Sequence, residues 1–391
     1  MKRLANGWVS VWGVLLVLAV LLAAAPAGAA DSDTAALTAG VGGALDARAA
    51  EGAGAGVPGG VNSEPVLRLD LRQAVELALA HNVELALARQ EVEAAQVALA
   101  QAEAMALISP SPTVLLQAES GLALARRNLA LSQQRVAFAV ESAYYDVLRL
   151  QNLLAVLDDA IGAARRQLAV AESRHRTGVA TQIDVLRAQT SLMQVEADRA
   201  QAADNLALVL NRFRQTVGLA PETVVQLDET VVTHEPVNIT LEEALAEGLA
   251  SRLELAQVRL GVEVAEKELE LATNDYTPEL TRVQAAIRLE QARLQLLQAE
   301  QGIALDIQRA YNALHDAHRR LAVAEQRLKE MEENWRVVQA LFDAGMATDL
   351  EVLQAQTGLT EARTGAINAV FDYNVARAEF FQAIARELTD R

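Results

Sequence analysis

The stretch RTGVATQIDVLRAQTSL, residues 176–192, decides the fold because a close copy, DAGMATDLEVLQAQTGL, recurs at residues 343–359. Aligning the copies places Gly178 on Gly345 and Thr181 on Thr348. In each copy, a glycine that can end a helix is followed three residues later by a threonine that can begin the next. Each copy therefore predicts a helix–turn–helix hairpin, and the chain presents two similar hairpin tips.

A second pair of similar segments shows that the duplication extends beyond the tips. The segment LRQAVELALAHNVELALARQEVEAAQ begins at Leu71, and LEEALAEGLASRLELAQVRLGVEVAE begins at Leu241. Internal similarity on this scale indicates that one structural unit is built twice. We therefore predict a first helical repeat over residues 66–236 and a second over residues 237–391.

Each repeat is expected to contain a first helix, a short breaker and a very long helix. Asp70 is the predicted cap of a helix that runs to about Leu107, and Thr240 is its counterpart. The breakers are residues 109–112 and 273–278, and the long helices are predicted over residues 113–176 and 279–344. At 1.5 Å per residue, each long helix would extend about 95 Å.

The spacing of apolar residues along the long helices predicts how they pack. Positions three and four residues apart are apolar without interruption, as in Val136, Val140, Ala143, Val147 and, in the second repeat, Ile307, Ala310, Leu314, Ala317. A sustained seven-residue repeat favours left-handed coiled-coil packing. The predicted fold class is all-α: a tandem duplication of long antiparallel helical hairpins that form an elongated coiled-coil bundle. Residues 221–239 are expected to be an extended linker whose strand pairing, where present, is local.

The N-terminal region has the features of an export signal. Lys2 and Arg3 precede an apolar run, and small residues up to Ala30 come before Asp31. This pattern predicts a signal peptide over residues 1–30, with an uncleaved membrane anchor as the alternative. Residues 31–65 are rich in Ala and Gly and are expected to form a flexible leader. Such a chain would be exported, and it has no Cys for disulfides.

Composition narrows the classes of partner and activity. The 391 residues carry a formal net charge of −17, which argues against nucleic acid or anionic lipid as the main partner. The acidic residues are spread along helix faces and are not paired as catalytic acids and bases. The sequence contains no phosphate-binding loop and no nucleophile motif. We therefore expect no enzyme activity and no cofactor.

One histidine pair requires consideration as a metal site. His315 and His318 lie three residues apart on a predicted helix. Zinc needs three or four ligands, and the spacing indicates no third one. Histidine pairs at this helical spacing are usually solvated, so we expect these side chains to be solvated and the chain to bind no metal.

The duplicated opening, the long helices and the tip sequences TGVAT and AGMAT together resemble the TolC-type family of outer-membrane efflux proteins, over nearly all of residues 66–391. The resemblance implies a homotrimer whose helices form a tunnel and whose tips meet a periplasmic adaptor protein attached to an inner-membrane pump. It assigns the adaptor-docking tips to Gly178, Val179, Thr181, Gly345, Met346 and Thr348. It also places tunnel-entrance polar positions at Glu351 and Gln354, with Asp184 aligned to Glu351 in the first repeat.

The sequence departs from that family in two respects. The family's tip-locking Tyr and Arg correspond to Phe342 and Ala347 here, so that polar link is expected to be absent. The family also has dozens of residues in place of each breaker, forming two membrane strands. A membrane strand needs about 9–11 residues, and the breakers here are too short for two strands and a turn. The expected fold is therefore the TolC-like helical domain without the β-barrel.

The leading hypothesis is an exported component of an efflux or type I secretion conduit in the cell envelope, which docks through its tips to an adaptor of a membrane pump. The periplasm, the outer membrane, or the outer side of a single-membrane cell would suit it. The alternative is a cell-envelope coiled-coil structural or spacer protein without channel activity. An adaptor protein is a weaker alternative, because adaptors carry one hairpin flanked by β-rich domains.

Overall fold

The computed structural model of the chain describes residues 67–228 and 236–386, so the predicted signal peptide and leader lie outside it. Both repeats belong to one compact unit, Asn62–Arg391. The first repeat contains, in order, β1 (Leu67–Leu69), α1 (Leu71–His81), α2 (Val83–Ala106), α3 (Pro112–Arg176), α4 (Gln182–Val217) and β2 (Val225–Leu227). The second contains α5 (Leu241–Ser251), α6 (Leu253–Ala272), α7 (Glu279–Asp343) and α8 (Asp349–Ala383).

The two long helices are confirmed almost to the residue. Helices α3 and α7 have 65 residues each, which corresponds to about 97 Å at 1.5 Å per residue. The junctions before them, residues 107–111 and 273–278, are turns and contain no strand, as their length predicted. Across residues 67–228 and 236–386, every helix is too short or too polar to cross a bilayer.

The prediction of one continuous helix from Asp70 to about Leu107 is wrong, because the chain breaks at Asn82. There the backbone is extended, with φ −66° and ψ 132°. The Asn82 side chain accepts a hydrogen bond from the Glu84 N–H at 2.8 Å and donates one to the Thr216 carbonyl at 2.9 Å. Asparagine competes well for such local bonds, so it ends α1 and caps α2. Arg252 breaks the second repeat at the matching place.

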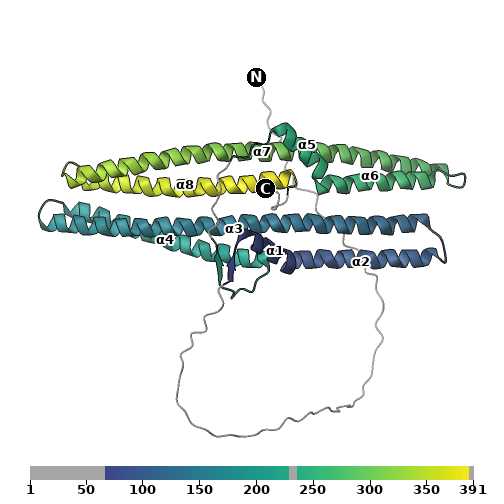
Figure 1. Cartoon of the computed structure of the whole chain (residues 1–391), viewed down its shortest axis with the longest axis horizontal. Coiled ribbons are helices and arrows are strands. Elements are labelled where there is room, and N and C mark those ends of the chain that lie inside the picture. Colours follow the sequence, from purple (N-terminus) through teal and green to yellow (C-terminus); the bar gives the residue numbers. More distant parts are fainter. Residues whose placement is uncertain (1–66, 229–235, 387–391) are drawn as a thin grey trace, which may run out of the picture. The chain divides into compact units, whose positions relative to one another are not determined.

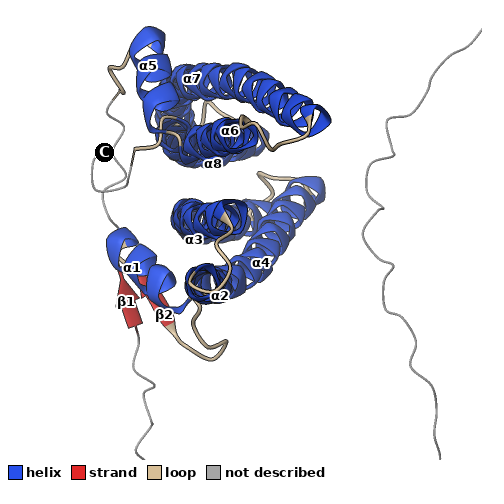
Figure 2. Cartoon of the chain, turned by 90° about the vertical axis from the view of Figure 1, so that its right-hand side faces the viewer, coloured by secondary structure: helices blue, strands red, loops and turns tan. Residues whose placement is uncertain are grey.

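The linker is extended at β2, as expected, but this strand does not pair locally. Its strand β2 pairs in parallel with β1 at the start of the described chain, with Leu67 opposite Val225 and Leu69 opposite Leu227. Figure 2 shows the two strands beside α1. The alternating burial of β2 explains the pairing, because Val225 and Leu227 are both buried against the first repeat's core.

The helices pack as two similar sets. Helix α3 lies along both α2 and α4, and α7 lies along both α6 and α8 (Figure 1). The sets meet where α3 packs against α6 and α8. The order of neighbours is therefore α2–α3–α6–α7 in the half that holds the two junctions and α4–α3–α8–α7 in the half that holds the tips. Helix α7 is an edge of both.

Burial confirms the predicted coiled-coil seam. Val136, Val140, Ala143 and Val147 of α3 are buried, and most of the equivalent α7 positions are buried or half-buried. Each repeat has a core near the middle of its long helix. The first joins α1, α3 and α4 around Tyr144 and Phe213, and the second joins α5, α7 and α8 around Tyr373 and Phe380. These cores fix the short helices α1 and α5 across the long ones.

Candidate functional site

Each hairpin tip begins with a helix end that only glycine accommodates without strain. Gly178 has φ +77° and Gly345 has φ +74°, in the left-handed region that a Cβ atom disfavours. The N–H of Gly178 donates to the His175 carbonyl at 3.0 Å, and that of Val179 donates to the Arg174 carbonyl at 2.9 Å. This pair of bonds defines a Schellman motif.

The second tip repeats the same bonds. The N–H of Gly345 donates to the Phe342 carbonyl at 2.9 Å, and that of Met346 donates to the Leu341 carbonyl at 2.8 Å. The duplicated sequence therefore encodes the same turn twice, as predicted.

The next helix in each hairpin starts at the threonine predicted to begin it. The N–H and hydroxyl of Thr181 donate to Asp184 Oδ2 at 2.9 and 2.6 Å. Those of Thr348 donate to Glu351 Oε2 at 2.7 and 2.9 Å. In the second tip the Glu351 N–H also donates to the Thr348 hydroxyl at 3.3 Å, which completes a capping box. Both turns are thus closed by hydrogen bonds at their two ends.

These caps hold the acidic side chains in the charged form. Hydrogen bonds from the Thr181 hydroxyl and backbone lower the pKa of Asp184, with Arg187 and Arg174 adding a smaller electrostatic effect. Hydrogen bonds from the Thr348 backbone and hydroxyl lower the pKa of Glu351. Both carboxylates are charged at neutral pH at the positive end of a helix dipole.

Apolar side chains remain exposed at both turns. Val179 is 67% exposed and Met346 is 71% exposed, at aligned positions directly after the two glycines. The starts of the returning helices expose Ile183, Leu186 and Leu350 as well. Ala347, by contrast, is buried. Exposed apolar side chains held on two rigid turns are suited to contact a protein partner.

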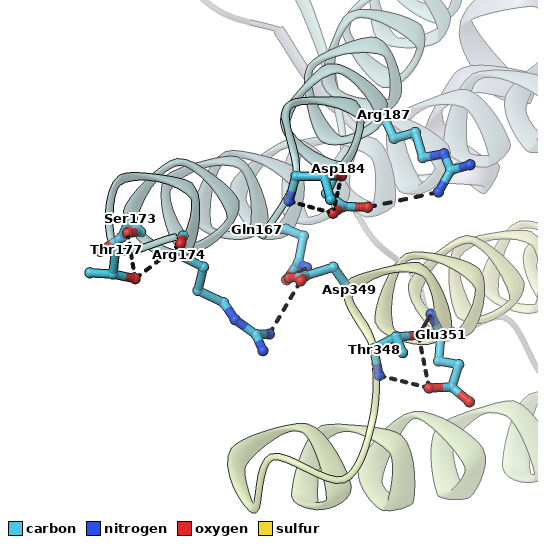
Figure 3. A network of polar contacts seen from close by, with 10 residues as sticks. Gln167, Ser173, Arg174, Thr177, Asp184, Arg187, Thr348, Asp349 and Glu351 are labelled. Atoms are coloured by element: carbon cyan, nitrogen blue, oxygen red, sulfur yellow. Dashed lines mark hydrogen bonds and ion pairs between the residues drawn. The ribbon is translucent and has the colours of Figure 1, made fainter. Parts of the chain in front are cut away.

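Polar contacts join the two tips to each other (Figure 3). Arg174 at the end of α3 lies 3.2 Å from the Asp349 carboxylate at the start of α8, and Gln167 donates to the same carboxylate at 3.4 Å. The Arg174 guanidinium also lies over the Phe342 ring, 4.7 Å from its centroid. Phe342 and Ala347 do not supply the family's polar link, but Arg174 and Asp349 connect the tips in another way.

Sequence reasoning missed this connection because its two residues lie 175 positions apart (349 − 174) on different repeats. Neither belongs to the shared motif, since Leu341 and Gln182 occupy the matching positions of the other copy. The one available signal was that Arg174 and Asp349 each carry a charge where the other copy of the tip has an uncharged residue.

The three predicted tunnel-entrance residues lie in different surroundings. Asp184 is half-buried, faces Arg187 at 3.8 Å, and lines a small cleft with Asp349 and Leu350 of the second tip. Glu351 and Gln354 are exposed and lie outside that cleft. The structure therefore brings Asp184 to the contact between the tips and leaves the other two at the surface.

The expectation that the histidine pair is solvated is wrong, because both side chains are half-buried against aromatic rings. His315 is 4.3 Å from the Tyr311 ring, and His318 is 5.5 Å from the Tyr373 ring, measured between centroids. Within the described ranges, no group of three or more potential ligands could hold a metal ion. The absence of a bound metal remains a prediction.

The fold and its two matched tips define a class of protein: a duplicated helical-hairpin bundle with two similar turns at one end. The model of the outer membrane efflux protein family matches residues 114–219 and 281–386, more than half of the chain. The chain belongs to this family.

A curated relative is similar over most of the chain, and solved structures share its fold. The outer membrane protein TolC of Vibrio cholerae is 23% identical over 300 residues, which cover 65% of this chain and 68% of that protein. A membrane protein from Pseudomonas aeruginosa has the same fold, with a TM-score of 0.69 at 14% identity over 83% of this chain and 92% of that one. The outer membrane protein VceC of Vibrio cholerae gives 0.63 at 17% identity, over 81% and 96%.

Proposed function

We propose that this chain is an exported component of an efflux or type I secretion conduit in the cell envelope. It assembles as a homotrimer and docks through its two hairpin tips to the adaptor protein of a membrane pump. Energy and substrate choice come from those partners, and the chain itself supplies a passage and a docking surface.

The observation that carries the proposal is a pair of exposed coiled-coil seams at opposite edges of the helix order α2–α3–α6–α7. On α2, a row of uncharged residues with alternating spacings of four and three is exposed: Val83, Leu87, Gln90, Ala94, Val97, Gln101 and Ala104. On α7, the equivalent row is Leu280, Val283, Ile287, Glu290, Leu294, Leu297 and Gln301, with one charge.

Both rows point away from the helices that cover α2 and α7 within the chain. The residues that α2 buries, among them Leu85, Ala88 and Ala102, lie on the side opposite its exposed row. The same holds for Ala285 and Leu289 of α7. An exposed heptad row over five or more turns is typical of a helix that packs against another helix.

Two different edges that each need a helix partner favour head-to-tail association of copies. When α7 of one copy packs against α2 of the next, the contact is heterologous and can close into a ring. A closed ring leaves no exposed seam and encloses a central space. The proposed number of copies is three, because members of the resembled family are trimers.

Docking through the tips rests on the exposed Val179 and Met346. They are presented on turns that hydrogen bonds hold rigid, and they occur in matched pairs on each chain. A partner with repeated apolar pockets could contact both turns in every copy.

The first experiment measures the mass of the purified chain in solution by size-exclusion chromatography with light scattering. We expect a trimer. Val97→Asp or Ile287→Asp places a charge in one of the two seams, at a residue that is 53% exposed in the single chain, and is expected to give monomers. Gln96→Asp adds the same charge to an exposed α2 position outside the seam and should leave the trimer intact. A wild-type monomer would favour the spacer hypothesis instead.

A second experiment tests docking. Val179→Ser together with Met346→Ser removes the apolar surface of the turns without touching a glycine or a cap. Adaptor capture should fall at least tenfold, while the trimer and the helix content measured by circular dichroism stay unchanged. Capture at the wild-type level would contradict the assignment of the tips as the docking surface.

A further inference from the structure

The two tips have the same backbone but opposite charge. Residues 174–187 of the first tip contain three arginines and one aspartate, a formal charge of +2, with His175 in addition. The aligned residues 341–354 of the second tip contain two aspartates and one glutamate and no basic residue, a formal charge of −3. The first tip is therefore basic although the chain as a whole has a formal net charge of −17.

Helix dipoles explain only part of this difference. The negative end of a helix favours cations, so the basic residues in the last turn of α3 are expected there. The last turn of α7 has none, and its final residue is Asp343, which the dipole disfavours. Asp343 is aligned with Arg176 of the first tip, and both side chains are exposed. Within α7 the Asp343 carboxylate accepts a hydrogen bond from the Gln339 side chain at 3.2 Å, and its exposure leaves it accessible to a partner.

The contact between the tips shows how this charge difference can act. Arg174 of the first tip already pairs with Asp349 of the second. The other exposed charges are Arg176 and Arg187 on the first tip and Asp343 and Glu351 on the second, and they are accessible to a partner that contacts the tips.

We infer that the two tips dock to chemically different sites on the adaptor: an acidic site receives the first tip and a basic site receives the second. This inference rests on the proposed function. Apolar contact through Val179 and Met346 would be common to both tips, whereas charge would decide which tip meets which site. A partner shifted by one tip would meet like charges, which is a penalty against the wrong register.

The occupant is an adaptor and not a second copy of this chain docked tip to tip. A tip-to-tip contact of two copies would also match positive with negative charge. It would, however, place the two open ends of the proposed conduit against each other and leave no surface for a pump.

The experiment exchanges the aligned charges. Arg176→Asp and Asp343→Arg are made singly and together, and the double variant keeps the net charge of the chain. The probes are the adaptor proteins of the source organism, each expressed as a soluble helical hairpin domain, and the one that the wild-type chain captures most strongly is used. Binding is measured at about 50 mM and about 500 mM salt, because screening at the higher salt weakens contacts between exposed charges.

We expect each single variant to bind about fivefold more weakly at low salt, and the double variant to regain part of that loss, because a register shifted by one tip then matches opposite charges. The differences should shrink at high salt. If neither single variant binds more weakly, or if one gains what the other loses, the two sites on the adaptor are equivalent and the inference is wrong, while the proposed docking stands. If the wild type captures no adaptor, the proposed function itself fails.

Two controls complete the design. Thermal unfolding of the variants should match the wild type, because both side chains are exposed and their replacement leaves the glycines and caps in place. Light scattering without adaptor should show no salt-sensitive doubling of the wild-type mass. Such a doubling, lost in the single variants, would assign the charged tips to a second copy and overturn the inference.

Discussion

Three glycines share a left-handed backbone but differ in their surroundings, and replacing each by alanine tests the account of the turns. Gly178, Gly218 and Gly345 have φ of +77°, +84° and +74°. At Gly178 and Gly345, an added Cβ would have no atom within 4 Å. At Gly218, which ends α4, it would lie 2.8 Å from the His81 carbonyl oxygen and 2.9 Å from its carbon.

The expected loss of unfolding free energy at each glycine depends on its left-handed backbone and on the contacts that an added Cβ would make. A left-handed conformation costs a residue with a Cβ about 1–2 kcal/mol, and this is the whole cost at the tips. At Gly218 the contacted atoms are backbone and cannot rotate away, so α4 must shift from the break between α1 and α2. Forced repacking of this kind adds about 1–3 kcal/mol. Gly218→Ala should therefore destabilise the chain by about 2–5 kcal/mol.

Urea unfolding followed by circular dichroism at 222 nm measures these differences. Gly178→Ala and Gly345→Ala should give small, similar losses of unfolding free energy, and Gly218→Ala a distinctly larger one. The Gly218 variant should also weaken the hydrogen bond from Asn82 to the Thr216 carbonyl, which makes the α1–α2 break more susceptible to proteolysis. Equal losses at all three positions would refute the argument from close approach.

Two further predictions concern the contacts at the tips. A double-mutant cycle with Arg174→Ala and Asp349→Ala, measured by urea unfolding, should give a coupling free energy of about 0.5–1 kcal/mol, because the pair is partly exposed. A coupling of zero would mean that this ion pair does not join the tips. The lowered pKa of Glu351 gives stability that is present above its unfolded value, 4.5, and is lost as pH falls through the lower folded value. Thr348→Ala removes both the hydroxyl bond and part of that acid dependence, which thermal unfolding between pH 3 and pH 7 would detect; an unchanged acid dependence would contradict the cap.

The sequence by itself determined the elements and their repetition. Two copies of a turn motif fixed both tips, because the glycine and threonine that end and begin helices act through bonds to residues at most five positions away. The seven-residue spacing fixed which faces of α3 and α7 are buried, since side-chain direction along a helix follows from its period. The short junctions likewise followed from residue counts alone.

Only the tertiary structure decided what depends on contacts between distant residues. The break at Asn82 is joined by a hydrogen bond to the Thr216 carbonyl at the end of α4, and β2 needed a partner strand at residues 67–69. The link from Arg174 to Asp349 and the exposed seams of α2 and α7 required knowing which helices lie side by side. Periodicity shows that a helix has an apolar face. It does not show which helix covers that face, because the heptad patterns of different helices are alike and any two could pack together. The neighbour order is set by packing of the whole unit, and it leaves the seams of α2 and α7 exposed.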